Sequence, residues 1–253
     1  MPTWVVGLAM IGGGVLISVL GLLFVRRRFP ADLMEKHHEV AGFIYGVVGV
    51  IYAVLLAFVV IIVWEHYAGA EATVSHEASC VSDLFRVSAG LPESQRSELR
   101  QAMRTYAKIV VKDEWPAMGR GAESRHAVEA VHEMWRVLVS LRPSTSEESN
   151  LQTVAIGILK EMNDQRRSRM LASRKGVPLV LWLALYSGAV VTILFSYFFG
   201  VKNLVAQCWM TGLLAWMIFS TLFLISALDY PFTGDVRVRP EAFEYVIEHM
   251  KLK

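Results

Sequence analysis

Three Glu-x-x-His triplets are the first residues in the chain whose types and spacing could do chemistry: Glu35/His38, Glu123/His126 and Glu129/His132. A spacing of three puts both side chains on one face of a helix, as in the di-iron carboxylate sites of helical bundles. Such a site needs further glutamates from other helices, and the second and third triplets point about 120° away from each other on one expected helix. We therefore interpret the triplets as solvent-facing charges and expect neither a metal site nor a cofactor.

A carboxylate next to a histidine, Glu65-His66, directly follows a long charge-free run. The pair could act as a gate or a proton sensor, because histidine titrates near neutral pH. The alternative, which we favour, is a pair of interfacial charges at the end of a membrane helix.

A second polar group precedes another apolar run. In an oligomer it could form a charged ring, since rings of arginine select anions and rings of acidic residues select cations. Anchoring at lipid headgroups explains the same residues equally well, so both interpretations stay open. The group comprises Asn163, Asp164, Arg166, Arg167 and Arg169.

Enzymatic chemistry and nucleic-acid binding are not indicated. The sequence has no Gly-x-Ser-x-Gly motif, P-loop, dinucleotide fingerprint or paired-cysteine metal motif, so we expect no enzyme. The formal net charge is only +2. The segment 65–175 carries 16 basic and 15 acidic residues, which gives no reason to expect nucleic acid as a partner.

Four charge-free runs of 25 or 26 residues dominate the sequence. Each is longer than the roughly 18 residues that indicate a transmembrane helix, and the mean hydropathy of the chain is +0.42. Four crossings put both termini and the segment 65–175 on one side of the membrane, although the flanking positive charges do not decide which side. The runs are Met1–Val25, Val40–Trp64, Gly176–Val201 and Asn203–Leu228.

The second run predicts a long helix, from Val40 to about Leu91, because the helical period continues after Glu65. In its membrane part, small residues at spacings of three and four form a stripe that would allow close helix packing, either between subunits or within one chain. These are Gly42, Gly46, Gly49, Ala53 and Ala57. A bulky face on the other side of the helix supplies candidate pore-lining residues: Val48, Tyr52, Leu55 and Val59.

The segment 65–175 predicts a soluble helical bundle, because it has no alternating run of β-branched residues. We expect its further helices at 93–115, 123–141 and 151–175, and we expect the last of these to continue into the third crossing, as the second crossing continues into the bundle. A C-terminal turn and an amphipathic helix starting at Pro240 complete an all-α chain. The predicted divisions are a first transmembrane pair at 1–64, the bundle at 65–175, a second pair at 176–228 and the C-terminal segment at 229–253.

Several stretches spread over nearly the whole chain resemble one family, the bestrophin-like bacterial membrane proteins. They include the C-terminal turn, with its motif residues Asp229, Pro231, Phe232, Gly234 and Asp235. The matching stretches are Tyr52–Val60, Val63–Glu65, Ala70–Val74, Glu77-Ala78, Glu114-Trp115-Pro116, Asn163-Asp164 with Arg166 and Arg169, and Ala227–Val238.

The resemblance implies a function. Bestrophins are pentameric anion channels with four membrane helices per subunit, a second helix that lines the neck, and a cytosolic helical domain. By analogy, we expect a homo-oligomeric chloride channel in the bacterial inner membrane, with the lipid bilayer and inorganic ions as its partners. Bestrophins present bulky residues at the neck, whereas the second helix here has both a bulky and a small face. A membrane-anchored sensory or scaffolding protein, whose bundle binds a protein partner, is the alternative.

Overall fold

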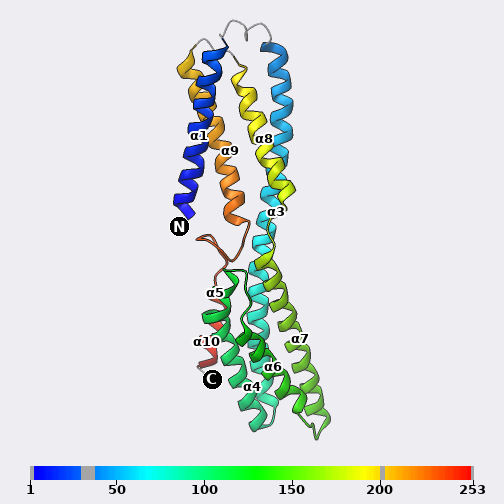
Figure 1. The fold of residues 1–253 in the computed structure, drawn as a ribbon. Helices are drawn as coiled ribbons and strands as arrows, with labels where there is room; N and C mark the ends of the chain where they lie inside the picture. Colours follow the sequence, from blue (N-terminus) through cyan, green and yellow to red (C-terminus); the bar gives the residue numbers. More distant parts are fainter. Residues whose placement is uncertain (1–2, 30–37, 200–202, 252–253) are drawn as a thin grey trace. The chain divides into compact units, whose positions relative to one another are not determined.

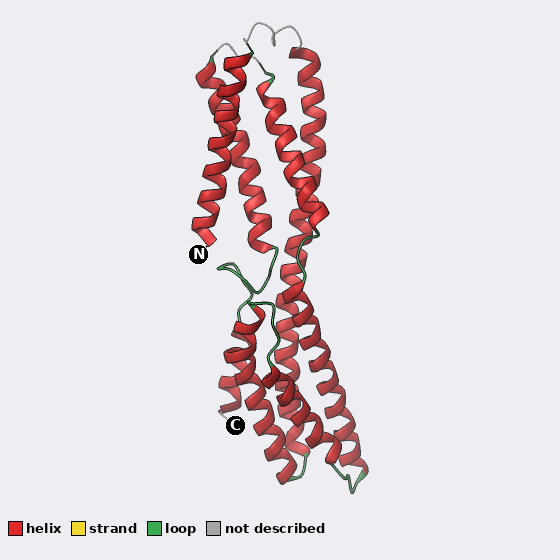
Figure 2. Cartoon of the chain, in the orientation of Figure 1, coloured by secondary structure: helices red, strands yellow, loops and turns green. Residues whose placement is uncertain are grey.

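The computed structural model describes residues 3–29, 38–199 and 203–251, and these form helices and connecting loops without a β-strand (Figures 1 and 2). The predicted all-α class is therefore confirmed. The chain divides into two compact units. A membrane unit contains residues 1–65, 176–229 and 234–236, and a bundle unit contains residues 66–175, 230–233 and 237–253.

The membrane unit consists of α1 (Thr3–Arg28), α8 (Leu179–Tyr197), α9 (Leu204–Leu228) and the first part of α3 (His38–Val87). Four helices of the described chain are long and apolar enough to cross a bilayer, which agrees with the four predicted crossings. Many of their large apolar side chains are exposed, as expected for surfaces that face lipid or another subunit.

Glycines bring α1 and α9 together. A Cβ atom at Gly7 would overlap the ring of Phe223, and one at Gly14 would overlap the ring of Phe219. Only glycine leaves room for these rings, so the α1–α9 contact follows the small-residue packing that is common among membrane helices.

The bundle unit combines the rest of α3 with α4 (Glu93–Ile109), α6 (Arg125–Ser140), α7 (Ser146–Arg174) and α10 (Glu241–Lys251). Between α4 and α6 lie η2 (Val110–Glu114), a π-helical turn, and the short α5 (Trp115–Met118). Two helix starts are capped by side chains, since Ser124 accepts a hydrogen bond from Ala127 N and Thr145 accepts one from Glu148 N. The bundle encloses a continuous apolar core.

The long helix α3 is unbroken from His38 to Val87, and the 3₁₀ turn η1 (Ser88–Gly90) ends it before Leu91-Pro92. The apolar face that the sequence predicts beyond Glu65 is buried in the bundle core at Ala70, Val74, Ala78, Val81 and Leu84.

Three helix boundaries differ from those predicted. The helix expected at 93–115 changes to a π-helical turn at Val110, and α7 begins at Ser146 because Thr145 caps it. The helix expected at 151–175 ends at Arg174, and residues 175–178 are not helical. Here Val177 N donates to Asp229 Oδ1 (2.5 Å), and Pro178 has no N–H to continue a helix.

The α1–α9 contact gives a first testable prediction. Gly14→Val places a side chain inside the ring of Phe219, and overpacking of this kind costs about 1–3 kcal/mol. Gly12→Val is the matched control, because it makes the same change on the same helix where a Cβ meets no atom within 4 Å. Thermal unfolding in detergent should show a lower midpoint for the first variant only; equal losses would contradict the packing described.

Candidate functional site

A cluster of buried polar side chains lies inside the bundle unit. It consists of Glu77 on α3, Tyr106 on α4, Glu114 in η2, and Arg166 and Arg169 on α7. Each of these residues is 5% exposed or less. Charged side chains are almost never buried to this extent unless they are paired, so these five residues, called the charge cluster below, form the candidate site.

Arg169 is the centre of the charge cluster. Its Nε and Nη2 donate to the two carboxylate oxygens of Glu77, at 2.7 and 2.9 Å, which is a bidentate pair. Nη2 also donates to Glu114 Oε2 (2.7 Å), and Nη1 lies 2.8 Å from Met118 Sδ. Because a guanidinium presents several donors in one plane, this single side chain can join α3, η2 and α5 to α7.

Glu114 and Glu77 each have a second partner. Arg166 Nη2 donates to Glu114 Oε1 (2.5 Å) and to Glu123 Oε1 (3.0 Å), a carboxylate that is half exposed. Tyr106 donates its hydroxyl to Glu77 Oε1. Two glutamates and two arginines are thus buried together, and their formal charges cancel.

The electrostatics of the charge cluster keep every donor protonated. Burial acts to lower the pKa of Arg169, but Glu77 outweighs it and the pKa is raised. Arg166 has a raised pKa for the same reason, with Glu114 as the main partner. Burial, followed by the charge of Glu77, raises the pKa of Tyr106 well above its usual value. The charge cluster therefore acts as a fixed connection among helices, with Arg166, Arg169 and Tyr106 as its donors.

The π-helical turn positions Glu114. Pro116 lacks an N–H group and its ring clashes with the carbonyl four residues earlier, that of Lys112, so an α-helix cannot continue regularly here. The chain widens into η2 instead, and Trp115 N donates to Val110 O, five residues back. The extra residue in this turn accompanies the burial of both Glu114 and Trp115.

Trp115 connects the charge cluster to the C-terminal segment. Arg169 lies 5.3 Å from the Trp115 ring, in cation–π geometry, and Trp115 Nε1 donates to Val238 O (3.3 Å). The Trp115 ring also packs edge-on against Phe232 and Phe243, at centroid distances of 5.8 and 6.3 Å. Phe232, a residue of the C-terminal motif, is therefore part of the bundle core.

The rest of the C-terminal motif fixes backbone turns. Asp229 accepts the hydrogen bond from Val177 N, and Asp235 accepts one from Thr3 N while its own N–H donates to Thr3 Oγ1 (2.9 Å). Gly234 has a φ of 73°, a conformation that favours glycine. Pro231 O accepts a hydrogen bond from Val238 N (2.7 Å), and both of these residues belong to the bundle unit.

Two of the residues expected in a charged ring lie elsewhere. Arg166 and Arg169 are inside the bundle unit, paired with Glu114 and Glu77, so they cannot form a ring of exposed charges. The reason is the helical face: residues three apart on α7 point the same way, here into the core.

The other candidates for a gate or a charged ring are exposed or half buried. Asp164 and Arg167 are exposed, and Asn163 is half buried on the same helix. Glu65 is exposed on α3, and His66 is half buried. For these five residues, a role at a gate or a filter stays a prediction.

The second and third Glu-x-x-His triplets lie at the start of α6 and within it, and their glutamates bind arginines. Glu123 binds Arg166, and His126 lies 3.0 Å from Asp113. Glu129 pairs with Arg125. Glu35, from the first triplet, lies outside the described residues.

The candidate pore-lining residues occupy two different positions on α3. Tyr52 and Val59 are buried within the chain, and Tyr52 OH donates to Leu185 O of α8 (3.1 Å). The Tyr52 ring also fills the space beside Gly188, where a Cβ would overlap it. Val48 and Leu55 are half buried. Tyr52 therefore packs α3 against α8, and Val59 is buried on the same side of α3.

The small-residue stripe is largely uncovered in a single chain. Gly46, Ala53 and Ala57 are exposed, and a Cβ at Gly46 or Gly49 would meet no atom within 4 Å. Gly42 is half buried near Phe199. The stripe is thus available for contact with a second copy of the chain or with lipid.

The charge cluster gives a second testable prediction. Arg169→Met removes the guanidinium at similar volume and leaves Glu77 and Glu114 buried without their central partner, which typically costs about 3–5 kcal/mol. Arg167→Met, two residues away on the exposed face, should change the stability by no more than about 0.5 kcal/mol. Chemical unfolding of the full chain in detergent measures the change in the free energy of unfolding for both variants. Equal changes would contradict the central role of Arg169 in the stability of the bundle.

Comparison with known proteins completes the description. The family model of the Bestrophin-like domain matches residues 12–243. A crystal structure of a bacterial bestrophin homologue from Klebsiella pneumoniae is 14% identical, with 96% of this chain and 97% of that chain covered and a TM-score of 0.71. A mutant of a homologue from the same organism gives the same values. A structure described as a mutant membrane protein is 13% identical, with a TM-score of 0.71 and the same coverage.

At these identities, the solved structures show a shared fold. No curated protein matches the sequence. The family model, however, spans nearly the whole chain, including α1, α3, the charge cluster and the C-terminal turn. The predicted resemblance is therefore confirmed, and the chain belongs to the Bestrophin-like family.

Proposed function

We propose that the chain is the subunit of a homo-oligomeric ion channel in the bacterial inner membrane, with α3 around the pore. The observation that carries this proposal is the exposed apolar face of α3. In its membrane part, Tyr52 packs against α8, and many large apolar side chains on the other sides are exposed in the described part of the chain. Assembly of several copies around an axis would give these exposed sides neighbours and enclose a pathway.

The exposure pattern of α3 supports one line of residues as the side that faces the axis. Val50, Val54 and Phe58 recur every four residues and are 64%, 49% and 62% exposed. At 100° per residue, this line is centred about 160° around the helix from the buried line of Tyr52, Val59 and Val63. If α3 is the helix nearest the axis of a ring of subunits, the side of α3 that faces the axis is the side that points away from its own chain.

This assignment refines the expected pore lining. Val48 and Leu55 lie nearer to the buried line, and Tyr52 and Val59 lie on it. The small-residue stripe lies to one side of Val50, Val54 and Phe58, where it would let a neighbouring subunit approach closely. A pore lined by valine and phenylalanine would resist wetting, and such apolar constrictions can act as gates.

The remaining parts of the proposal follow from the family. Anion conduction, with chloride as the natural ion, a pentameric ring and a cytosolic bundle are carried over from bestrophins by analogy. Glu65 would lie at the end of the membrane part of α3, and Asp164 and Arg167 would lie exposed on the bundle. These positions suit charges that attract or sort ions before they enter the pore.

Single-channel recording tests the proposed function. The purified oligomer in a planar bilayer should carry current, and its reversal potential in a chloride gradient should report anion selectivity. Absence of current from well-folded oligomers across pH and voltage would contradict the channel and favour the scaffolding alternative.

The pore lining is tested in the same recordings. Val54→Ala should raise the conductance, because it widens an apolar constriction. Val190→Ala is the matched control, since Val190 is a similarly exposed valine (55%) on α8 of the same unit. A larger conductance change in the control would place the pathway away from Val54.

A further inference from the structure

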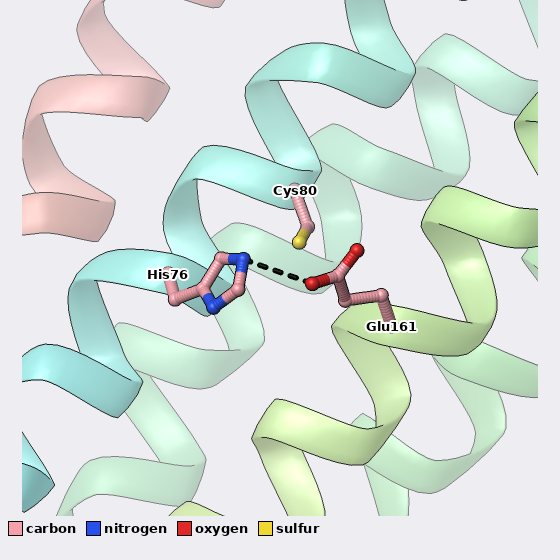
Figure 3. A group of neighbouring side chains, drawn as sticks. All are labelled: His76, Cys80 and Glu161. Carbon is pink, nitrogen blue, oxygen red and sulfur yellow. Dashed lines mark ion pairs between the residues drawn. The ribbon is translucent and has the colours of Figure 1, made fainter.

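Three side chains of types that bind metals converge on the surface of the bundle unit. His76 and Cys80 lie on α3, and Glu161 lies on α7 (Figure 3). One donor atom from each residue lies within 4.8 Å of the other two. His76 Nε2 is 3.0 Å from Glu161 Oε1, and Figure 3 shows the Cys80 sulfur on the same side.

The spacing of these residues suits shared ligation. His76 and Cys80 are four residues apart on one helix, so their side chains point the same way. Glu161 reaches toward them from the neighbouring helix (Figure 3). The ligands of a tetrahedral zinc ion lie about 3.3–3.7 Å apart, given its usual bond lengths. Small rotations of the side chains would bring the present arrangement to that geometry.

The donor types restrict the metal. A thiolate, an imidazole and a carboxylate together favour a borderline-soft divalent ion such as Zn²⁺ over Mg²⁺ or Ca²⁺, which prefer oxygen ligands. Three protein ligands leave a fourth position for water.

Access from solvent also favours the site. Cys80 is buried, whereas the side chains of His76 and Glu161 are about half exposed (50% and 53%), so an ion can reach the ligands from solvent. Burial, followed by the charges of Glu161, Asp83 and Glu77, raises the pKa of the Cys80 thiol to about 11. A bound cation would displace the thiol proton, because the thiolate is the form of cysteine that binds metals.

We propose that His76, Cys80 and Glu161 form a binding site for one zinc-class divalent ion that connects α3 to α7. This inference departs from the expectation that the chain binds no metal. A bound ion would add a second cross-link between the two helices that Glu77 and Arg169 already join. Without a metal, the His76–Glu161 pair would be an exposed ion pair of small energetic value.

Cobalt substitution tests the site directly. The full chain, free of affinity tags and treated with a chelator, is titrated with Co²⁺. One ion per chain should bind, with the near-ultraviolet charge-transfer band of a cobalt–thiolate bond, and Zn²⁺ should displace it. Cys80→Ser should abolish the band. Cys208→Ser is the matched control: it changes the second free cysteine, which lies in the membrane unit, and it should leave the band intact.

Two further variants distinguish a loss of metal binding from a loss of folding. His76→Gln and Glu161→Gln alter half-exposed side chains and should keep the fold, while Zn²⁺ affinity falls by at least the roughly 10–100-fold that loss of a ligand-orienting group costs. Zn²⁺ should also raise the thermal midpoint of the wild type and not of these variants. No stoichiometric binding, or binding that survives loss of Cys80, would overturn the proposal.

Discussion

The pairing of Arg169 with Glu77 and Glu114 is the interaction on which the bundle depends. These side chains come from α7, α3 and η2, and each would be very costly to bury alone. Together with Arg166 they form a charge-balanced group, in which almost every donor has an acceptor on another helix. Apolar packing alone would tolerate sliding of one helix along another, whereas a bidentate pair specifies one register. Well-packed apolar residues in place of the charge cluster could give equal stability. We therefore propose that the main role of the charge cluster is to fix the register of α3 against α7.

That registration matters because α3 belongs to both units. Its membrane part carries the line of Val50, Val54 and Phe58, and the bundle holds the same helix by Glu77. A continuous helix transmits rotation and translation along its length better than a loop does. The chain entering α8, by contrast, is interrupted at 175–178. We therefore propose α3 as the connection through which a change in the bundle would reach the proposed pore, and the proposed metal site would act on this same helix.

The sequence was sufficient for the architecture, because membrane crossings and amphipathic faces depend on patterns local to each helix. The four crossings, the all-α bundle and the long α3 could all be predicted in this way. The pairing of Arg169 could not, since its partners lie 92 and 55 residues away and no local pattern links them. Glu77, Glu114, Arg166 and Arg169 did stand out as stretches shared with the family, but without a structure nothing indicated that they meet.

The orientation of α3 shows the same limit. The sequence pattern distinguishes a small face from a bulky face, but the side that α8 covers follows from contacts in the structure, those of Tyr52 with Leu185 and Gly188 and that of Tyr45 with Phe195. Cysteine accessibility along α3 tests the resulting account most directly. In oligomers whose Cys80 and Cys208 are replaced by serine, a water-soluble thiol reagent should block current through Val50→Cys, Val54→Cys and Phe58→Cys and leave Val59→Cys unaffected. Block at Val59→Cys without block at the other three positions would contradict it.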